Sequence, residues 1–491
     1  MLLKISTIVY LIVLFIIYHL VPGKFRGMIL LPASILFVYA EGGIMGLAVL
    51  VFITVCAYAA GLVIGREGSG RRFVMALSVA VFVGILACWK YIPWLLVQSG
   101  IVAAERLAGT GRLATVMAMP IGLSFYTFQA ISYVVDVYTG KLKAPEKKML
   151  RFAIYMMWFP KWMSGPIERC GDFMKQLEAS ARVKLFSQEY VLRLEKSVSF
   201  LVWGLFMKLV IADRLGTVVD SVYADMASCG FVTMMLASVL YTIQIYCDFA
   251  GYTNAMIGIS GLFGIDLTQN FVTPYFAENT VEFWRRWHIS LSSWLRDYVY
   301  IPLGGNRKGI ARKRINTLIV FFICGMWHGA GLSFIVWGIL HGLFNVATDA
   351  LKKGRAAFLT KGVVGRVLTF CLVSFAWIFF RANGLGEALT FVKGMVPGVN
   401  AAAPLAGLVV SESAMLGISV MEWWIAAISL VVLVGLDGYA YIRRDVVPVL
   451  VGERWGVVGR TVLLTALIFV VLIFGKYGSG EDIRSFMYMQ F

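Results

Sequence analysis

The sequence lacks the linear motifs that mark several common soluble enzyme classes. It contains no H-E-x-x-H zinc signature, no G-x-x-x-x-G-K-[ST] phosphate-binding loop and no G-x-S-x-G nucleophile elbow. Its 7 cysteines are scattered without a C-x-x-C pair, and most lie in apolar runs. The cysteines therefore predict buried free thiols, with neither a disulfide framework nor a bound metal.

Charge is also scarce in this chain. Charged residues form only 14% of the 491, whereas 60% are hydrophobic and the mean hydropathy is +0.81. A soluble domain holds about half apolar residues. We find no proline- or serine-rich linker, no low-complexity tract, no repeat and no polar stretch long enough for a separate soluble domain. These features predict an integral membrane protein with a single domain over residues 1–491.

Apolar runs recur along the whole chain, several of them near the roughly 20 residues that cross a bilayer as a helix. They predict an all-α, polytopic bundle of about 10–12 membrane helices, with interfacial and re-entrant helices in addition. No small-residue cleavage site follows the first run, so a retained helix is expected there and not a signal peptide. The runs lie near residues 5–22, 43–65, 73–98, 115–135, 198–212, 231–247, 316–344, 365–380, 424–436 and 461–475.

The formal net charge of +17 is spread over short basic loops. The three main clusters span Lys141–Arg151, Arg307–Arg314 and Lys352–Arg366. Lysine and arginine are enriched in the cytoplasmic loops of membrane proteins, so all three clusters are predicted to be cytoplasmic. Membrane lipid, and not nucleic acid, is the partner that this charge pattern indicates.

An apolar run is interrupted at WFPKWMSGPIERC, residues 158–170, by Pro160 and Pro166. Broken backbone at membrane depth survives only where protein buries it or where it lines a cavity. The segment therefore favours a cavity wall, with an ordinary interfacial loop as the alternative. The polar section that follows, about Ile167 to Lys196, has apolar residues at helical spacing and predicts surface helices on the cytoplasmic side.

Residues 282–305, EFWRRWHISLSSWLRDYVYIPLGG, have the spacing of one amphipathic helix, at about 100° per residue. The apolar face comprises Trp284, Trp287, His288, Leu291, Trp294, Leu295 and Tyr298. The opposite face carries arginine, serine and aspartate. An interfacial helix with a tryptophan belt and a hydrogen-bonded core histidine explains this spacing as well as a reaction site does.

His328 lies in GMWHGAG, residues 325–331, inside a run otherwise suited to hydrocarbon. Basic clusters on both sides predict a hairpin with both feet in the cytoplasm. The leg from Ile315 to His328 rises only about 21 Å, against a hydrocarbon core about 30 Å thick, so the turn is expected within the membrane. His328 should then lie near the tip, either on a polar pathway or as a structural histidine bonded to a carbonyl.

A deeply buried imidazole can take part in two kinds of chemistry. Burial disfavours the charged form, and a neutral ring has one nitrogen that accepts a proton. A general base needs this property when it activates a hydroxyl or thiol for acyl transfer. A proton relay in a transporter or channel needs it too, so the residues alone leave both functions open.

Two blocks resemble the membrane-bound O-acyltransferase family, and within it the bacterial alginate O-acetyltransferase-type branch. They read FWRRWHISLSSWLRDYVYIPLGGNR and GMWHGAGLSFIVWGILHG. The ending FMYMQF, residues 486–491, resembles the aromatic tail of that branch. Weaker similarity is confined to residues 1–110 and 385–460. Further matching blocks follow in family order at residues 121–138, 159–169, 244–258 and 269–276.

The resemblance implies roles for particular residues around a central tunnel. His328 falls at the family's catalytic histidine, and His288 at a second active-site position that other branches fill with Asn or Asp. Asp248 and Asn270 lie in matching blocks, where a tunnel role cannot be separated from packing or helix capping. The remaining candidates are expected to line the tunnel or to support the reacting groups, and these are Trp327, His341 and Asp136.

The resemblance also implies a reaction. A cytoplasmic acyl thioester, expected to be acetyl-CoA, would supply an acetyl group for an extracytoplasmic polysaccharide of the alginate type, with no bound cofactor. A separate periplasmic or membrane-tethered acetyltransferase is the expected partner, and the cytoplasmic (inner) membrane the expected location. D-alanyl transfer to teichoic acid from a carrier protein is the alternative within the family, and a transporter or channel with a histidine proton relay is the alternative outside it.

Overall fold

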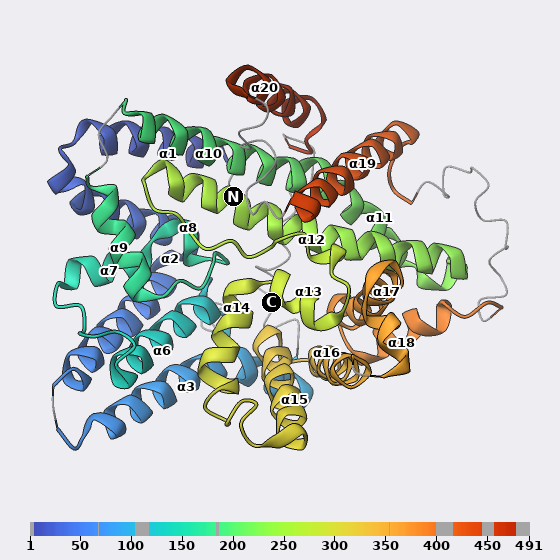
Figure 1. Ribbon diagram of the computed structural model, residues 1–491, viewed down its shortest axis with the longest axis horizontal. Coiled ribbons are helices and arrows are strands. Elements are labelled where there is room, and N and C mark those ends of the chain that lie inside the picture. Colours follow the sequence, from blue (N-terminus) through green and yellow to red (C-terminus); the bar gives the residue numbers. More distant parts are fainter. Residues whose placement is uncertain are drawn as a thin grey trace. The chain divides into compact units, whose positions relative to one another are not determined.

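A computed structural model describes residues 4–66, 68–103, 117–182, 186–352, 354–398, 416–443 and 456–477 (Figure 1). All regular elements among these residues are helices, and these residues form no strand. The predicted all-α class is therefore confirmed. The aromatic tail, residues 486–491, lies outside the described residues.

The contacts divide the chain into two compact units. The first comprises residues 1–198 and 256–268, and the second comprises residues 199–255 and 269–491. The chain passes between them within helices α10 (Gln188–Leu205) and α12 (Phe231–Leu262), and again between Thr268 and Gln269. The expectation of one domain over residues 1–491 stays a prediction.

The first unit is built around α2, which packs against α3, α6 and α7. Helix α2 consists of two helices that meet at Gly43, where φ is +66°. The apolar run predicted there began only at residue 43, because Pro32 and the charged Lys24, Arg26 and Glu41 interrupt the pattern before it. The helices are α1 (Ile5–Leu20), α2 (Gly23–Ile64), α3 (Arg71–Gln98), α6 (Leu123–Thr139), α7 (Met149–Met157), α8 (Phe159–Trp162) and α9 (Cys170–Ser180).

The backbone breaks predicted at Pro160 and Pro166 occur in the interior of the first unit. Helix α7 ends at Met157, α8 has 4 residues, and every residue from 158 to 168 is buried. The buried amine of Lys161 donates to the side-chain oxygen of Gln129 and lies 4.4 Å from the centre of the Tyr155 ring. Burial of this kind fits broken backbone inside the protein and disagrees with an exposed interfacial loop.

The second unit holds both histidine-bearing blocks. Helix α16 packs against α13, α15 and α17, and η1 packs against α11, α19 and α20. The elements are η1 (Phe206–Ala212), α11 (Asp213–Ala224), η2 (Met226–Ser228), η3 (Pro274–Phe276), α13 (Thr280–Arg286), α14 (Ile289–Leu295), η4 (Arg296–Tyr300), α15 (Gly309–His328), α16 (Leu332–Leu351), η5 (Arg355–Thr360), α17 (Gly362–Arg381), α18 (Leu385–Gly394), α19 (Val420–Arg443) and α20 (Gly456–Phe474).

Helices α15 and α16 form the predicted hairpin, joined by residues 329–331. Their backbones approach closely at two glycines: a Cβ atom at Gly325 would lie 2.4 Å from the carbonyl oxygen of Phe334, and one at Gly338 would lie 2.3 Å from that of Phe321. Helix α15 begins six residues before the predicted leg, since its first turns carry the basic cluster. The hairpin is confirmed, whereas the depth of its tip and the side of its feet stay predictions.

The helices have the length and surface of membrane spans. Among the described residues six are long and apolar enough to cross a bilayer, namely α2, α3, α12, α16, α17 and α19, and α1 and α20 are shorter apolar helices. The expected total of 10–12 includes helices that carry more charge than this criterion admits, such as α15 with its Arg312, Lys313 and Arg314. Large apolar side chains lie exposed along α1 and α19, including Ile12, Ile16, Ile428 and Val431. Such surfaces belong in lipid, so the chain is a multi-pass membrane protein.

Candidate active site

His328 is the last residue of α15, at the point where the hairpin turns. Its side chain is buried, with 5% of the residue exposed. The imidazole packs edge-to-face against three aromatic rings, with centroid distances of 4.9 Å to Trp327, 4.9 Å to Trp337 and 5.2 Å to Phe380. The predicted burial of this histidine at the hairpin tip is confirmed.

His288 lies at a break in the helix that the sequence predicted as continuous. Helix α13 ends at Arg286, and α14 begins at Ile289. Between them His288 has a φ of +44°, in the left-handed region that non-glycine residues rarely adopt. It is 1% exposed, and its ring packs edge-to-face on Phe249 at 4.9 Å. The prediction of one amphipathic helix over residues 282–305 is therefore wrong.

Asn270 stabilises the break between α13 and α14. Its side-chain oxygen accepts a hydrogen bond from the backbone N–H of Ser290 at 3.2 Å, and its backbone carbonyl accepts one from Ile289 at 3.0 Å. These bonds satisfy the first donors of α14, which otherwise lack partners. A left-handed residue costs about 1–3 kcal/mol, so it persists only where its surroundings determine it. The structure thus shows Asn270 as a cap of the helix that follows His288.

Trp327 lies between the two candidate catalytic histidines. The centre of its ring is 4.9 Å from that of His328 and 6.1 Å from that of His288. Residues 40 positions apart in the sequence therefore meet in one buried aromatic cluster within the second unit. The cluster includes Trp337 of α16 and Phe380 of α17, as well as Phe249 of α12.

His341 of α16 forms a hydrogen bond with Trp284 of α13, and so connects the two histidine-bearing blocks. The indole N–H of Trp284 donates to Nδ1 of His341 at 3.2 Å, so the neutral ring carries its proton on Nε2. Both residues are buried, and this bond holds α13 against α16. Trp337 then separates His341 from His328, with ring distances of 5.0 Å and 4.9 Å. His341 thus contacts Trp284 and Trp337, and its supporting role at the site stays a prediction.

Asp248 is the partner of a buried lysine. Lys208 Nζ lies 2.5 Å from Asp248 Oδ1 and 2.8 Å from Asp213 Oδ1, and all three residues are buried. Lys208 sits on η1, a π-helical segment of the kind that is frequent at functional sites. Asp248 precedes Phe249, which packs against His288. The structure thus shows an ion pair at Asp248, and a tunnel role for this residue stays a prediction.

Asp136 belongs to the first unit, where it lies near the end of α6. Its carboxylate is 3.9 Å from the exposed amine of Lys141, and its carbonyl accepts from the N–H of Leu142. These contacts order the turn after α6. Of the seven predicted site residues, it is the only one outside the second unit.

Several residues of the cluster were missed by sequence reasoning. Phe249, Trp337 and Phe380 lie in apolar runs, where every position has similar hydropathy and no linear signal shows which face meets a histidine. Lys208 had a usable signal, since an ionisable residue inside an apolar run is costly and is commonly functional or paired. A search for such residues would have found it.

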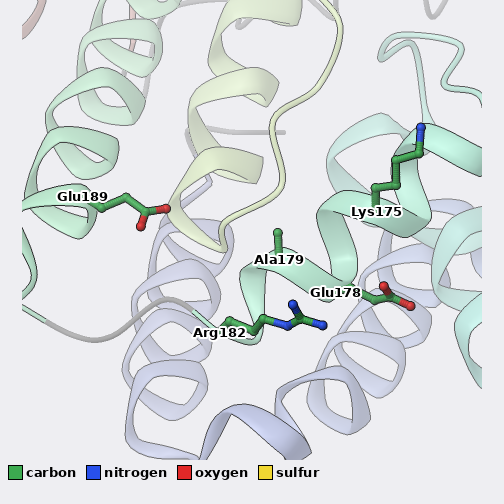
Figure 2. Close-up of a pocket in the computed structure, with 5 residues that line it drawn as sticks. All are labelled: Lys175, Glu178, Ala179, Arg182 and Glu189. Carbon is green, nitrogen blue, oxygen red and sulfur yellow. The ribbon is translucent and has the colours of Figure 1, made fainter.

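Two of the surface cavities are lined by residues that the structure describes. The first, of about 330 Å³, lies in the first unit and is lined by Lys175, Glu178, Ala179, Arg182 and Glu189. Figure 2 shows Arg182 extending toward Glu178 on the same segment, with Glu189 contributed by α10. Its charges balance and it contains no histidine. The second cavity, of about 490 Å³, lies beside α13 in the second unit.

Fold and site together define a class: a multi-pass helical membrane protein with three buried histidines, His288, His328 and His341, in one aromatic cluster. The sequence profile of the membrane-bound O-acyltransferase family matches residues 146–386. The chain is 34% identical over 377 residues to a probable alginate O-acetylase of Pseudomonas syringae pv. tomato, covering 76% of this chain and 70% of that protein. The chain therefore belongs to the membrane-bound O-acyltransferase family and is an O-acyltransferase.

Two further relatives show the range of acceptors named within the family. A peptidoglycan O-acetyltransferase of Helicobacter pylori is 32% identical over 394 residues, covering 74% of this chain and 72% of that protein. A teichoic acid D-alanyltransferase of Bacillus subtilis is 27% identical over 276 residues, covering 54% of this chain and 69% of that protein. The similarity to the D-alanyltransferase is lower in both identity and coverage.

Proposed function

We propose that this protein transfers an acetyl group from a cytoplasmic thioester, most simply acetyl-CoA, for O-acetylation of an extracytoplasmic polysaccharide of the alginate type. The observation that carries the proposal is the meeting of His288 and His328 at Trp327, in a buried cluster of a family of O-acyltransferases. Relatives named alginate O-acetylase support the polysaccharide class. Their 33–34% identity exceeds that of the D-alanyltransferase from Bacillus subtilis.

In the proposed reaction His328 is the general base. An acceptor hydroxyl attacks the carbonyl carbon of the thioester while an imidazole nitrogen of His328 takes the hydroxyl proton. The C–S bond then breaks, an ester is formed, and the departing thiolate receives the proton. The buried site keeps bulk water away from the thioester, which limits hydrolysis. A two-step route, in which the imidazole carries the acetyl group briefly, uses the same residue and gives the same products.

His288 is the second active-site residue in this proposal. Its left-handed backbone limits which substitutions fit at this position without strain. Asn tolerates a positive φ and keeps a hydrogen-bonding edge, whereas Ala loses both advantages. We expect His288→Asn to retain at least about tenfold more acetyl transfer than His288→Ala, since losing the polar contact to a charged transition state costs about 1.5–3 kcal/mol. Initial rates at equal protein concentration measure the difference.

His288→Gly separates the two contributions to that result. Glycine accepts φ = +44° without strain but has no side chain. If glycine restores thermal stability and not activity, the side chain itself supports the reaction. Equal activity of the Asn, Ala and Gly variants would contradict a polar role for position 288.

The wider setting follows from the same proposal. The protein would lie in the cytoplasmic (inner) membrane, with the donor reaching it from the cytoplasm. A secreted or membrane-tethered acetyltransferase would complete delivery to the polysaccharide, since the acceptor lies outside the membrane. The transporter alternative loses its support, because the family and its named relatives are acyltransferases.

The proposal is tested with the purified protein in lipid vesicles. Acetyl-CoA labelled in the acetyl group is supplied on one face, and an alginate oligosaccharide together with the partner acetyltransferase on the other. Labelled, ester-linked acetyl on the oligosaccharide is the expected product. Transfer only from a D-alanyl carrier protein, with none from acetyl-CoA, would overturn the acetyl assignment in favour of the D-alanyl alternative.

A further inference from the structure

The residue that follows Phe380 holds the end of α17 against α11. Arg381 is the last residue of α17, and its Nη2 lies 2.5 Å from Oδ1 of Asp220 on α11. The same guanidinium lies 4.6 Å from the centre of the Tyr223 ring, about one turn further along α11. An arginine makes both contacts at once, because its planar group pairs with a carboxylate through its edge and stacks on a ring through its face. We call Arg381, Asp220 and Tyr223 the arginine clamp.

Helix α11 is also held near its beginning by an ion pair. Asp213, its first residue, lies 2.8 Å from Nζ of Lys208, which pairs with Asp248 of α12 at 2.5 Å. Asp213 and Asp220 are seven residues apart, which is close to two helical turns, so their carboxylates project from nearly the same face of α11. Arg381 therefore pairs with a helix that is already fixed on that face.

The arginine clamp adjoins the aromatic rings around His328. Phe380 is buried, and its ring centre lies 5.2 Å from that of His328. The same ring packs on Phe334 at 5.3 Å and on Trp337 at 5.2 Å. Ring contacts are individually weak, whereas a charge-assisted hydrogen bond has a defined length and direction. The contacts of Arg381, one residue further along α17, are therefore suited to fix the position of Phe380.

The ion pair of the arginine clamp is partly exposed. The side chain of Arg381 is 19% exposed and that of Asp220 is 43% exposed. Because Arg381 ends a candidate membrane span, the pair is expected at the interface and in contact with water. Ion pairs that are exposed to this extent contribute little to the free energy of unfolding. A change at Asp220 should therefore leave the fold intact, so that an effect on the reaction can be separated from an effect on stability.

We propose that Arg381 and Asp220 are positioning residues for acyl transfer, which hold Phe380 against the imidazole of His328 and so fix the orientation of that ring. The inference rests on the proposed function, because it takes His328 as the base that meets the acceptor hydroxyl. A base must lie within hydrogen-bond reach of the proton it takes, and a misplacement of about 1 Å can cost about 100-fold in rate. Neither residue of the pair touches the reacting atoms, so the pair should affect kcat and not KM for the donor.

Asp220→Asn removes the charge of the pair and keeps the size of the side chain. In vesicles supplied with acetyl-CoA and the alginate oligosaccharide, we expect this variant to lower kcat about tenfold, with KM for acetyl-CoA within about twofold of wild type. Asp220→Glu restores the carboxylate and should recover part of the rate. The double variant Asp220→Asn/Arg381→Gln should be no slower than the slower single variant, because both changes break the same contact.

Arg366, near the other end of α17, provides the matched control. Its guanidinium pairs with Glu278 at 3.2 Å and lies 5.0 Å from the centre of the Tyr441 ring, so its contacts are of the same two kinds. Its neighbours in the chain, Gly365 and Val367, carry no ring that could face a histidine. The corresponding change, Glu278→Gln, should therefore leave kcat within about twofold of wild type.

The position of Phe380 can be followed without turnover. 4-Fluorophenylalanine is introduced in place of Phe380, and the fluorine NMR resonance of the purified protein is recorded in detergent. The resonance is sensitive to the aromatic rings around it, including that of His328. We expect it to shift or broaden when Asp220→Asn is added, and to stay unchanged when Glu278→Gln is added.

Two outcomes would overturn the inference. One is an unchanged fluorine resonance in Asp220→Asn, which would show that the pair does not hold Phe380 in place. The other is a loss of kcat that is equally large in Asp220→Asn and Glu278→Gln, which would show a general effect of breaking an ion pair on α17. If the resonance changes as expected but the wild type transfers no acetyl group, the link from Asp220 to Phe380 is confirmed and the proposed function is refuted.

Discussion

Replacing His328 with alanine is expected to lower acetyl transfer about 10²- to 10⁴-fold, the contribution that a general base typically makes. The imidazole lies among Trp327, Trp337 and Phe380 at the end of α15. The measurement is the initial rate of labelled acetyl transfer in vesicles. Activity within about threefold of wild type would remove His328 from the role of base.

Alanine also leaves a space in this cluster, so a second variant separates chemistry from packing. His328→Gln keeps most of the side-chain volume and a hydrogen-bonding edge, yet it cannot act as a base near neutral pH. We expect it to be as inactive as the alanine variant while unfolding at the wild-type temperature. His19→Ala is the matched control, because His19 bonds only its own helix at the carbonyl of Phe15 among its described hydrogen bonds.

The largest expected effect on stability comes from Lys208. Replacing it with methionine leaves the buried carboxylates of Asp213 and Asp248 facing one another without their shared cation. Breaking a buried ion pair from one side costs about 3–5 kcal/mol, because the remaining charge stays desolvated. We therefore expect a clear drop in the thermal unfolding temperature of the detergent-solubilised protein, together with lower expression in the membrane.

The ion pair between Lys208 and Asp248 is tested by removing both of its charges together. Asp248→Asn keeps the Lys208–Asp213 pair and should be milder than Lys208→Met. The combined Lys208→Met/Asp248→Leu variant removes one charge of each sign and should recover part of the stability, since replacement of a whole buried pair by apolar groups is often neutral. If the double variant is as unstable as the sum of Lys208→Met and Asp248→Leu measured singly, the two residues do not act as a pair.

Parts of this molecule could be predicted because their causes are local. Long apolar runs require helices in lipid, where backbone groups must be satisfied within the segment. Glycines around His328 permit the close approach of α15 and α16, so the hairpin is visible in GMWHGAG itself. The candidate histidines were identified by the residue blocks that resemble a family, and the structure places both in one cluster.

Other features depend on residues far apart in the chain, and only the tertiary structure decided them. The helix predicted over residues 282–305 breaks because Asn270 caps α14 and because burial holds His288 in the left-handed region. The ion pair of Asp248 with Lys208, 40 residues earlier in the chain, has no signal in the sequence around Asp248. The sequence by itself therefore determined the membrane class, the helical hairpin and the candidate reacting groups, through local hydropathy and glycine spacing. The tertiary structure decided where helices stop and which charges pair, because caps and buried counter-ions are supplied by segments that hydropathy cannot bring together.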